Sequence, residues 1–203
     1  MQGLLDGALR IARRGARGAA LAGGTLLLAS ALLVATEVIL RRAFSITLGG
    51  ADELSGYTLA IASTWSFAFV LLERGNIRID ALYQHLPRRL AALCDLLALV
   101  ALLGFFGLVS WHGAGVLMQS WHLDAHSNTA LGVPLVWPQA LWWAGYAWFM
   151  VCGLLLSLRG LQGLIDRDWD GMDRLLGART VQEDAADEIP PGRPPGPAPE
   201  AAR

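Results

Sequence analysis

Four long stretches of apolar residues, almost free of charge, dominate this sequence of 203 residues. A helix needs roughly 20 consecutive apolar residues to cross the hydrocarbon core of a bilayer, and each stretch is close to that length. Backbone groups cannot stay unpaired in lipid, so each stretch must be helical. The sequence therefore predicts an all-α membrane protein with four transmembrane helices. The predicted spans are residues 19–40, 54–72, 90–109 (extending as far as 118) and 137–158.

The composition agrees with a membrane protein rather than a soluble domain. Apolar residues make up 54% of the chain and charged residues 16%, whereas a typical soluble domain carries about 25% charged residues. Membrane lipid is therefore an expected partner. The net charge is -1, so no nucleic acid or other polyanion is expected to bind.

The first apolar stretch resembles a secretory signal, because arginines precede it and Ala29-Ser30-Ala31 is typical of a cleavage site. A signal has an apolar region of only about 7–15 residues. Here the apolar run continues to Leu40. We therefore expect it to be retained as a transmembrane helix.

Arginines are distributed unevenly between the two sides of the predicted spans. Eleven flank the spans on one side and two, Arg41 and Arg42, on the other. The arginine-rich side of a multi-span membrane protein faces the cytoplasm, so both chain ends are predicted to be cytoplasmic. The eleven are Arg10, Arg13, Arg14, Arg17, Arg74, Arg78, Arg88, Arg89, Arg159, Arg167 and Arg174.

Three regions follow from this pattern. Residues 1–17 form a basic cytoplasmic amino terminus, residues 18–160 the four-helix transmembrane domain, and residues 161–203 a cytoplasmic tail. The tail is rich in proline and is predicted to be disordered from about residue 189. Between the second and third spans, Gly75 to Asp80 alternates apolar with polar residues, which predicts a short segment along the membrane surface.

Ionisable residues inside membrane helices are costly, so each needs a partner or a purpose. Glu37 lies near the outer end of the first span, and Arg41 follows it by four residues on the same helix face. Either the two side chains satisfy each other, or one of them contacts a partner subunit. The sequence leaves both readings open.

Three further carboxylates lie within or directly before predicted spans. Asp95 lies one to two turns inside the third span, where it either reaches toward the cytoplasmic surface or pairs with an arginine of a neighbouring helix. Asp52 and Glu53 open the second span, where negative charge favours the helix dipole. They too are candidates for contact with a partner subunit.

No catalytic, cofactor-binding or metal-binding motif was found in the sequence. It lacks a GxSxG elbow, an HExxH pair and a P-loop, so we expect no enzyme activity, no cofactor and no metal. Cys94 and Cys152 stand alone in apolar runs and are expected to be packing residues. His122, Asp124 and His126 lie close together in the outer loop, where an exposed polar loop is the expected reading and a metal site the alternative.

The order and spacing of several short motifs indicate a family. Arg41-Arg42 follows the first span, Gly50-Ala51-Asp52-Glu53-Leu54-Ser55 opens the second, and Gly75-Asn76-Ile77-Arg78-Ile79-Asp80 precedes Leu86-Pro87-Arg88-Arg89. The third loop carries Ser127, Thr129, Pro134 and Trp137-Pro138-Gln139. From Gly18 to Gly160 the chain resembles the small membrane subunit of tripartite ATP-independent periplasmic (TRAP) transporters. Many relatives carry His where this chain has Asn76.

The resemblance implies a function and partners. The small subunit pairs with a large multi-span permease, and a periplasmic binding protein delivers the substrate, usually a carboxylate, for sodium-driven uptake. The small subunit would serve as a scaffold. Candidate structural or subunit-interface residues are Glu37, Arg41, Arg42, Asp52, Glu53, Asn76, Arg78, Asp80 and Asp95. An unrelated four-helix assembly factor and a membrane redox protein are the alternatives.

Overall fold

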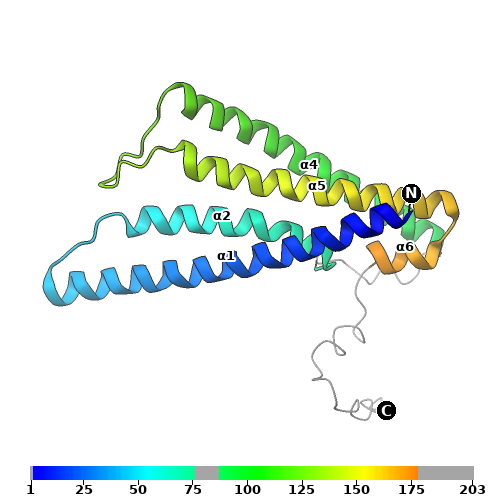
Figure 1. Ribbon diagram of the computed structural model, residues 1–203, viewed down its shortest axis with the longest axis horizontal. Coiled ribbons are helices and arrows are strands. Elements are labelled where there is room, and N and C mark those ends of the chain that lie inside the picture. The colour runs from blue at the N-terminus through cyan, green and yellow to red at the C-terminus, as the bar shows by residue number, and fades with distance from the viewer. Residues whose placement is uncertain (1, 76–86, 178–203) are drawn as a thin grey trace, which may run out of the picture.

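The computed structural model describes residues 2–75 and 87–177 and forms five helices within them (Figure 1). Four are long and apolar enough to cross a membrane: α1 (Gln2–Phe44), α2 (Ala51–Leu72), α4 (Arg88–His122) and α5 (Val136–Asp166). The fifth, α6 (Trp169–Leu176), is short and amphipathic. The prediction of an all-α protein with four transmembrane helices is confirmed. The predicted surface segment and the proline-rich tail lie outside the described residues.

The long helices form two antiparallel pairs, α1 with α2 and α4 with α5, which meet where α2 packs against α5. The connection 45–50 and the loop 123–135 lie at one end of the bundle, called here the hairpin end (Figure 1). The start of α1 and α6 lie at the other end, called here the α6 end. In this arrangement α1 contacts α2 and, less extensively, α5.

Small residues allow the helices to approach closely where they cross. A Cβ atom added to Gly23 of α1 would lie 3.2 Å from Ala62 Cα of α2. One added to Gly145 of α5 would lie 2.8 Å from Thr64 Cβ of α2. Helices in lipid associate through close packing of this kind, because lipid tails are as apolar as the helix surfaces. The Trp65 indole N–H also donates to the Leu141 carbonyl oxygen at 3.0 Å, joining α2 to α5.

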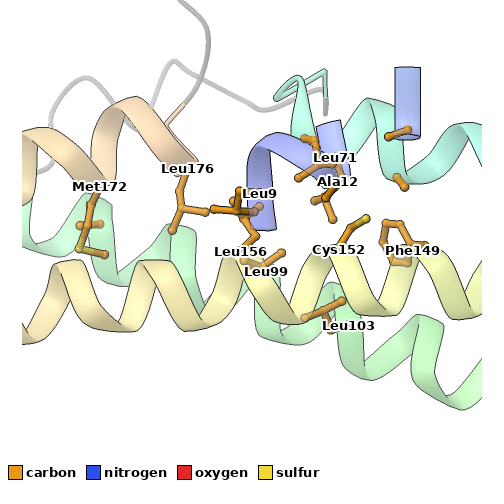
Figure 2. Close-up of a cluster of buried hydrophobic side chains, with 14 residues drawn as sticks. Leu9, Ala12, Leu71, Leu99, Leu103, Phe149, Cys152, Leu156, Met172 and Leu176 are labelled. Carbon is orange, nitrogen blue, oxygen red and sulfur yellow. The ribbon is translucent and has the colours of Figure 1, made fainter. Parts of the chain in front are cut away.

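The largest buried cluster lies toward the α6 end, where α1, α2, α4, α5 and α6 all contribute side chains (Figure 2). Leu9 of α1 lies close to Leu156 and Leu176 in this view, and Ala12 lies next to Leu71 above Cys152. Met172 of α6 is 2% exposed and packs against Gly163 of α5. Helix α6 therefore belongs to the packed body of the protein.

Two helices extend well beyond the predicted spans. Helix α1 has 43 residues, which gives a length of about 64 Å, against the roughly 30 Å thickness of a bilayer's hydrocarbon core. It continues without a break across the boundary predicted between residues 17 and 18. Helix α5 runs on to Asp166 and is followed directly by α6. The three-region division remains a prediction, but α1 and α5 each cross one of its boundaries.

Candidate functional site

At the hairpin end, the loop between α4 and α5 folds into a small antiparallel turn. Ser127 N–H donates to the Val133 carbonyl oxygen and Leu135 N–H donates to the Ala125 carbonyl oxygen, each at 2.9 Å. Ser127 Oγ accepts a further bond from Val133 N–H at 3.1 Å. These bonds fix the loop in one shape and present Thr129 at its tip toward α2.

Glu53 in the first turn of α2 holds this loop. The Thr129 hydroxyl donates to Glu53 Oε2, and the Tyr57 hydroxyl donates to Glu53 Oε1. Gly50 lies under the same loop with φ 111°, and a Cβ atom there would lie 2.5 Å from Leu131. Glycine is thus required at this position both by its left-handed backbone and by the closeness of Leu131. The loop and the start of α2 form one unit.

Glu37 and Arg41 form an ion pair one turn apart on α1, with 2.8 Å between Arg41 Nη2 and Glu37 Oε1. The two members differ in environment: the Glu37 side chain is 8% exposed and that of Arg41 60%. Within the described part of the chain, Glu37 Oε2 is buried and accepts no hydrogen bond. Arg42 and Asp52 are exposed.

The α6 end carries a second polar cluster. Arg88 of α4 pairs with Asp170 of α6, with 2.8 Å between Nη1 and Oδ1, and the Arg89 guanidinium lies 5.9 Å from the centre of the Trp169 ring. Asp95 is 4% exposed and lines a pocket of about 220 Å³ between α4 and α6, together with Arg88 and Asp170. Asp95 was predicted to lie inside the third span, and the structure places it there in a polar pocket.

An apolar groove opens between α1, α2 and α5. Its volume is about 780 Å³, and its walls include Gly18 and Ala22 of α1, Thr58 of α2 and Leu141 of α5.

Across the residues that the structure describes, no group of three or more His, Cys, Asp and Glu side chains is placed to hold a metal ion. Cys94 and Cys152 are both free thiols.

The structure brings some of the predicted residues together and separates others. Glu37 and Arg41 pair with each other, and Glu53 reaches the loop 123–135, whereas Asp95 lies at the opposite end of the bundle. Asn76, Arg78 and Asp80 lie outside the described residues. Sequence reasoning missed the contact between Glu53 and Thr129, since 76 residues separate them and only the Glu53–Tyr57 spacing of four hints at a cluster.

Comparison with known proteins decides the family. Residues 30–163, about two thirds of the chain, match the family model of the DctQ component of tripartite ATP-independent periplasmic transporters. The chain belongs to this family. Neither the curated proteins nor the solved structures contain a significant match.

The matched region covers most of the bundle of this DctQ-family protein. It includes all of α2 and α4, most of α5 and the last part of α1, so both the Glu37–Arg41 pair and the Glu53–Thr129 contact fall within it. The first 29 residues and α6 lie outside it. The protein is thus a small inner-membrane subunit of a tripartite transporter, in a family of transport components rather than enzymes.

Proposed function

We propose that this subunit is the scaffold partner of a large multi-span permease in sodium-driven uptake of a carboxylate, delivered by a periplasmic binding protein. The observation that carries the proposal is the family match over four packed helices. The alternative of an unrelated assembly factor is set aside by that match, and no observation favours a redox protein.

The distribution of charge supports a scaffold role. Residues 18–36, 54–72, 96–123 and 136–158 contain no Asp, Glu or Arg, so the charged side chains of the four long helices gather toward the two ends of the bundle. Its middle is held by apolar side chains and by close glycine contacts such as Gly145 with Thr64. A rigid apolar bundle is suited to support a moving transport domain, whose own chain would hold the substrate and sodium sites.

We further propose that both chain ends face the cytoplasm, from the asymmetry of arginines across the spans. The hairpin end, with its loop 123–135, would then face the periplasm, where the binding protein arrives. Reporter fusions after Arg17 and after Arg174 should report a cytoplasmic location, and a fusion at Ser127 a periplasmic one. A periplasmic carboxyl terminus would contradict this orientation.

The partner proposal is tested by co-purification. The tagged chain, expressed together with its candidate large permease and extracted in mild detergent, should carry that permease with it in a fixed ratio. An unrelated polytopic membrane protein, expressed at the same level, serves as the control and should not be retained. Recovery of the tagged chain without the permease would refute the scaffold proposal.

A further inference from the structure

One side of the first part of α1 carries a row of arginines, Arg10, Arg13, Arg14 and Arg17, which we call the arginine row. All four are exposed. Residues three and four apart lie on the same side of a helix, so their guanidinium groups form one basic strip. The other side of the same turns is packed into the bundle, with Leu9, Ala12 and Ala16 exposed by 5%, 2% and 0%.

The arginine row differs from the neighbouring arginines in its partners. At the same end of the bundle, Arg88 is paired with Asp170 and Arg159 with Asp6, at 2.8 and 2.9 Å. Within residues 2–75 and 87–177, no member of the arginine row forms an ion pair. Asp6 is the single acidic residue before Glu37, and Arg159 already takes its carboxylate. The strip therefore keeps its positive charge.

Two members of the row border a cleft between α1 and α6. Its volume is about 250 Å³, and Asp6, Leu9, Arg10, Arg13 and Leu175 line it. Two arginines without an ion pair face one carboxylate that is already paired, so the cleft has a net positive charge. Leucine side chains from both helices make the rest of its wall apolar. Such a cleft fits an anionic group attached to an apolar molecule.

The height of the cleft along the bundle places it at the membrane surface. Ala12 lies beside Leu71 (Figure 2), one residue before the end of α2, where charged Glu73 and Arg74 follow. The arginine row therefore spans the level at which the apolar part of α2 gives way to polar residues. Ile11, at the side of the row, is 70% exposed. Lipid headgroups occupy this level of a bilayer.

We infer that the cleft between α1 and α6 binds the phosphate of an anionic phospholipid through Arg10 and Arg13, with Arg14 and Arg17 extending the contact toward the bilayer. Arginine suits this role because its planar guanidinium forms paired hydrogen bonds to phosphate oxygens. Basic clusters beside a transmembrane helix bind anionic lipid surfaces by the same attraction. Both walls of the cleft lie outside residues 30–163, the part of the chain that matches the family model.

The test measures lipid retained by the purified full-length chain. The chain is exchanged into detergent containing equal amounts of phosphatidylglycerol and phosphatidylcholine, and bound lipid is identified by native mass spectrometry. Wild-type chain should retain phosphatidylglycerol in preference. The double variant Arg10→Gln/Arg13→Gln should lower that preference roughly tenfold or more, and Arg10→Lys/Arg13→Lys should keep most of it. The measurement needs no transport partner, so its outcome is independent of the proposed function.

Three controls determine what the result means. Arg42→Glu changes the net charge by the same two units at the other end of α1, without touching the Glu37–Arg41 pair, and should leave the preference unchanged. An equal loss would show that only net charge matters and would overturn the site. Inorganic phosphate at matched ionic strength should not displace the lipid; displacement would assign the cleft to soluble phosphate instead. A chain ending at Gly177 should still bind the lipid, because every residue that lines the cleft comes before Gly177. Loss of binding would place the site in residues 178–203 and overturn the proposal.

Discussion

At the scale of single residues, the Glu37–Arg41 pair is the clearest case of a charge held in an apolar segment. The carboxylate is buried and the guanidinium is exposed, so the two members do not play equal parts. Removing the exposed partner leaves a buried acceptor unsatisfied, whereas removing the buried partner leaves an arginine that can reach water.

We therefore predict an asymmetric effect of the two substitutions. Arg41→Gln should lower the free energy of unfolding by about 1–3 kcal/mol, the cost of an unsatisfied buried polar group. Glu37→Gln should cost about 0.5 kcal/mol, the scale of a surface helical ion pair. Unfolding of the purified chain by a denaturing detergent measures both. Equal losses would show that burial of Glu37 does not govern the pair.

Gly145 gives a second prediction at the residue scale. A methyl group there would lie 2.8 Å from Thr64 Cβ, so Gly145→Ala should push α5 from α2 and cost about 1–3 kcal/mol, as overpacking does. Gly104 is the matched control, because among the described residues an added Cβ there would meet no other helix within 4 Å. Gly104→Ala should be neutral or slightly stabilising through helix propensity. A similar loss in both variants would contradict the close contact of α2 with α5.

At the scale of elements, the loop 123–135 depends on α2 for its position. Thr129→Val removes the hydroxyl that donates to Glu53 while keeping a similar volume, and should speed hydrogen exchange of the amides of Ser127 and Val133. Ser55→Ala is the control, since the Ser55 hydroxyl donates to the Asp52 carbonyl oxygen within α2 and, among the described residues, does not contact the loop. Unchanged exchange in Thr129→Val would mean that the loop's own hydrogen bonds suffice to hold it.

Helix α6 gives a second prediction at this scale. Met172 is 2% exposed, and Ile165, at the end of α5, is 72% exposed. Truncation of a buried methionine costs about 2–5 kcal/mol, so Met172→Ala should release α6 and make residues 167–177 sensitive to protease. Ile165→Ala should leave it resistant. Equal resistance of wild type and Met172→Ala would show that α6 is not held by this contact.

The sequence predicts the spans well and the ends of the helices poorly. Hydropathy marks residues 19–40, yet α1 runs from Gln2 to Phe44, because a helix continues into water or headgroups without any change in its backbone bonds. Docking of α6 was not predicted. Its contacts with Gly160 and Gly163 depend on how α5 ends and turns back, at an αL residue, Arg167. Short-range patterns contain little information about such a turn.

The contacts of the polar residues could likewise be predicted from the sequence only where the partners are close in the chain. Glu37 and Arg41 are four residues apart, so helical periodicity predicts that they meet. Glu53 belongs to the α1–α2 pair and Thr129 to the loop between α4 and α5, so their contact requires the two helix pairs to pack side by side with this loop next to the start of α2. The predicted topology places them on one side of the membrane without bringing them together. Asp95 was assigned to the correct span, but its pocket is completed by α6, which hydropathy did not reveal.

At the scale of the whole molecule, the bundle has apolar helices in its middle and polar clusters at both ends. This division suits the proposed scaffold role, which needs one surface for lipid and for the proposed large permease and two ends for aqueous contacts. The account therefore predicts that the chain contributes to transport only within an assembled complex.

Transport in sealed vesicles tests this most directly. Vesicles carrying the purified chain alone, the large permease alone, or both are given a sodium gradient, the binding protein and its labelled solute. The account predicts uptake only when both membrane subunits and the binding protein are present, and its loss when the sodium gradient is collapsed. Uptake by vesicles that contain this chain alone would contradict it.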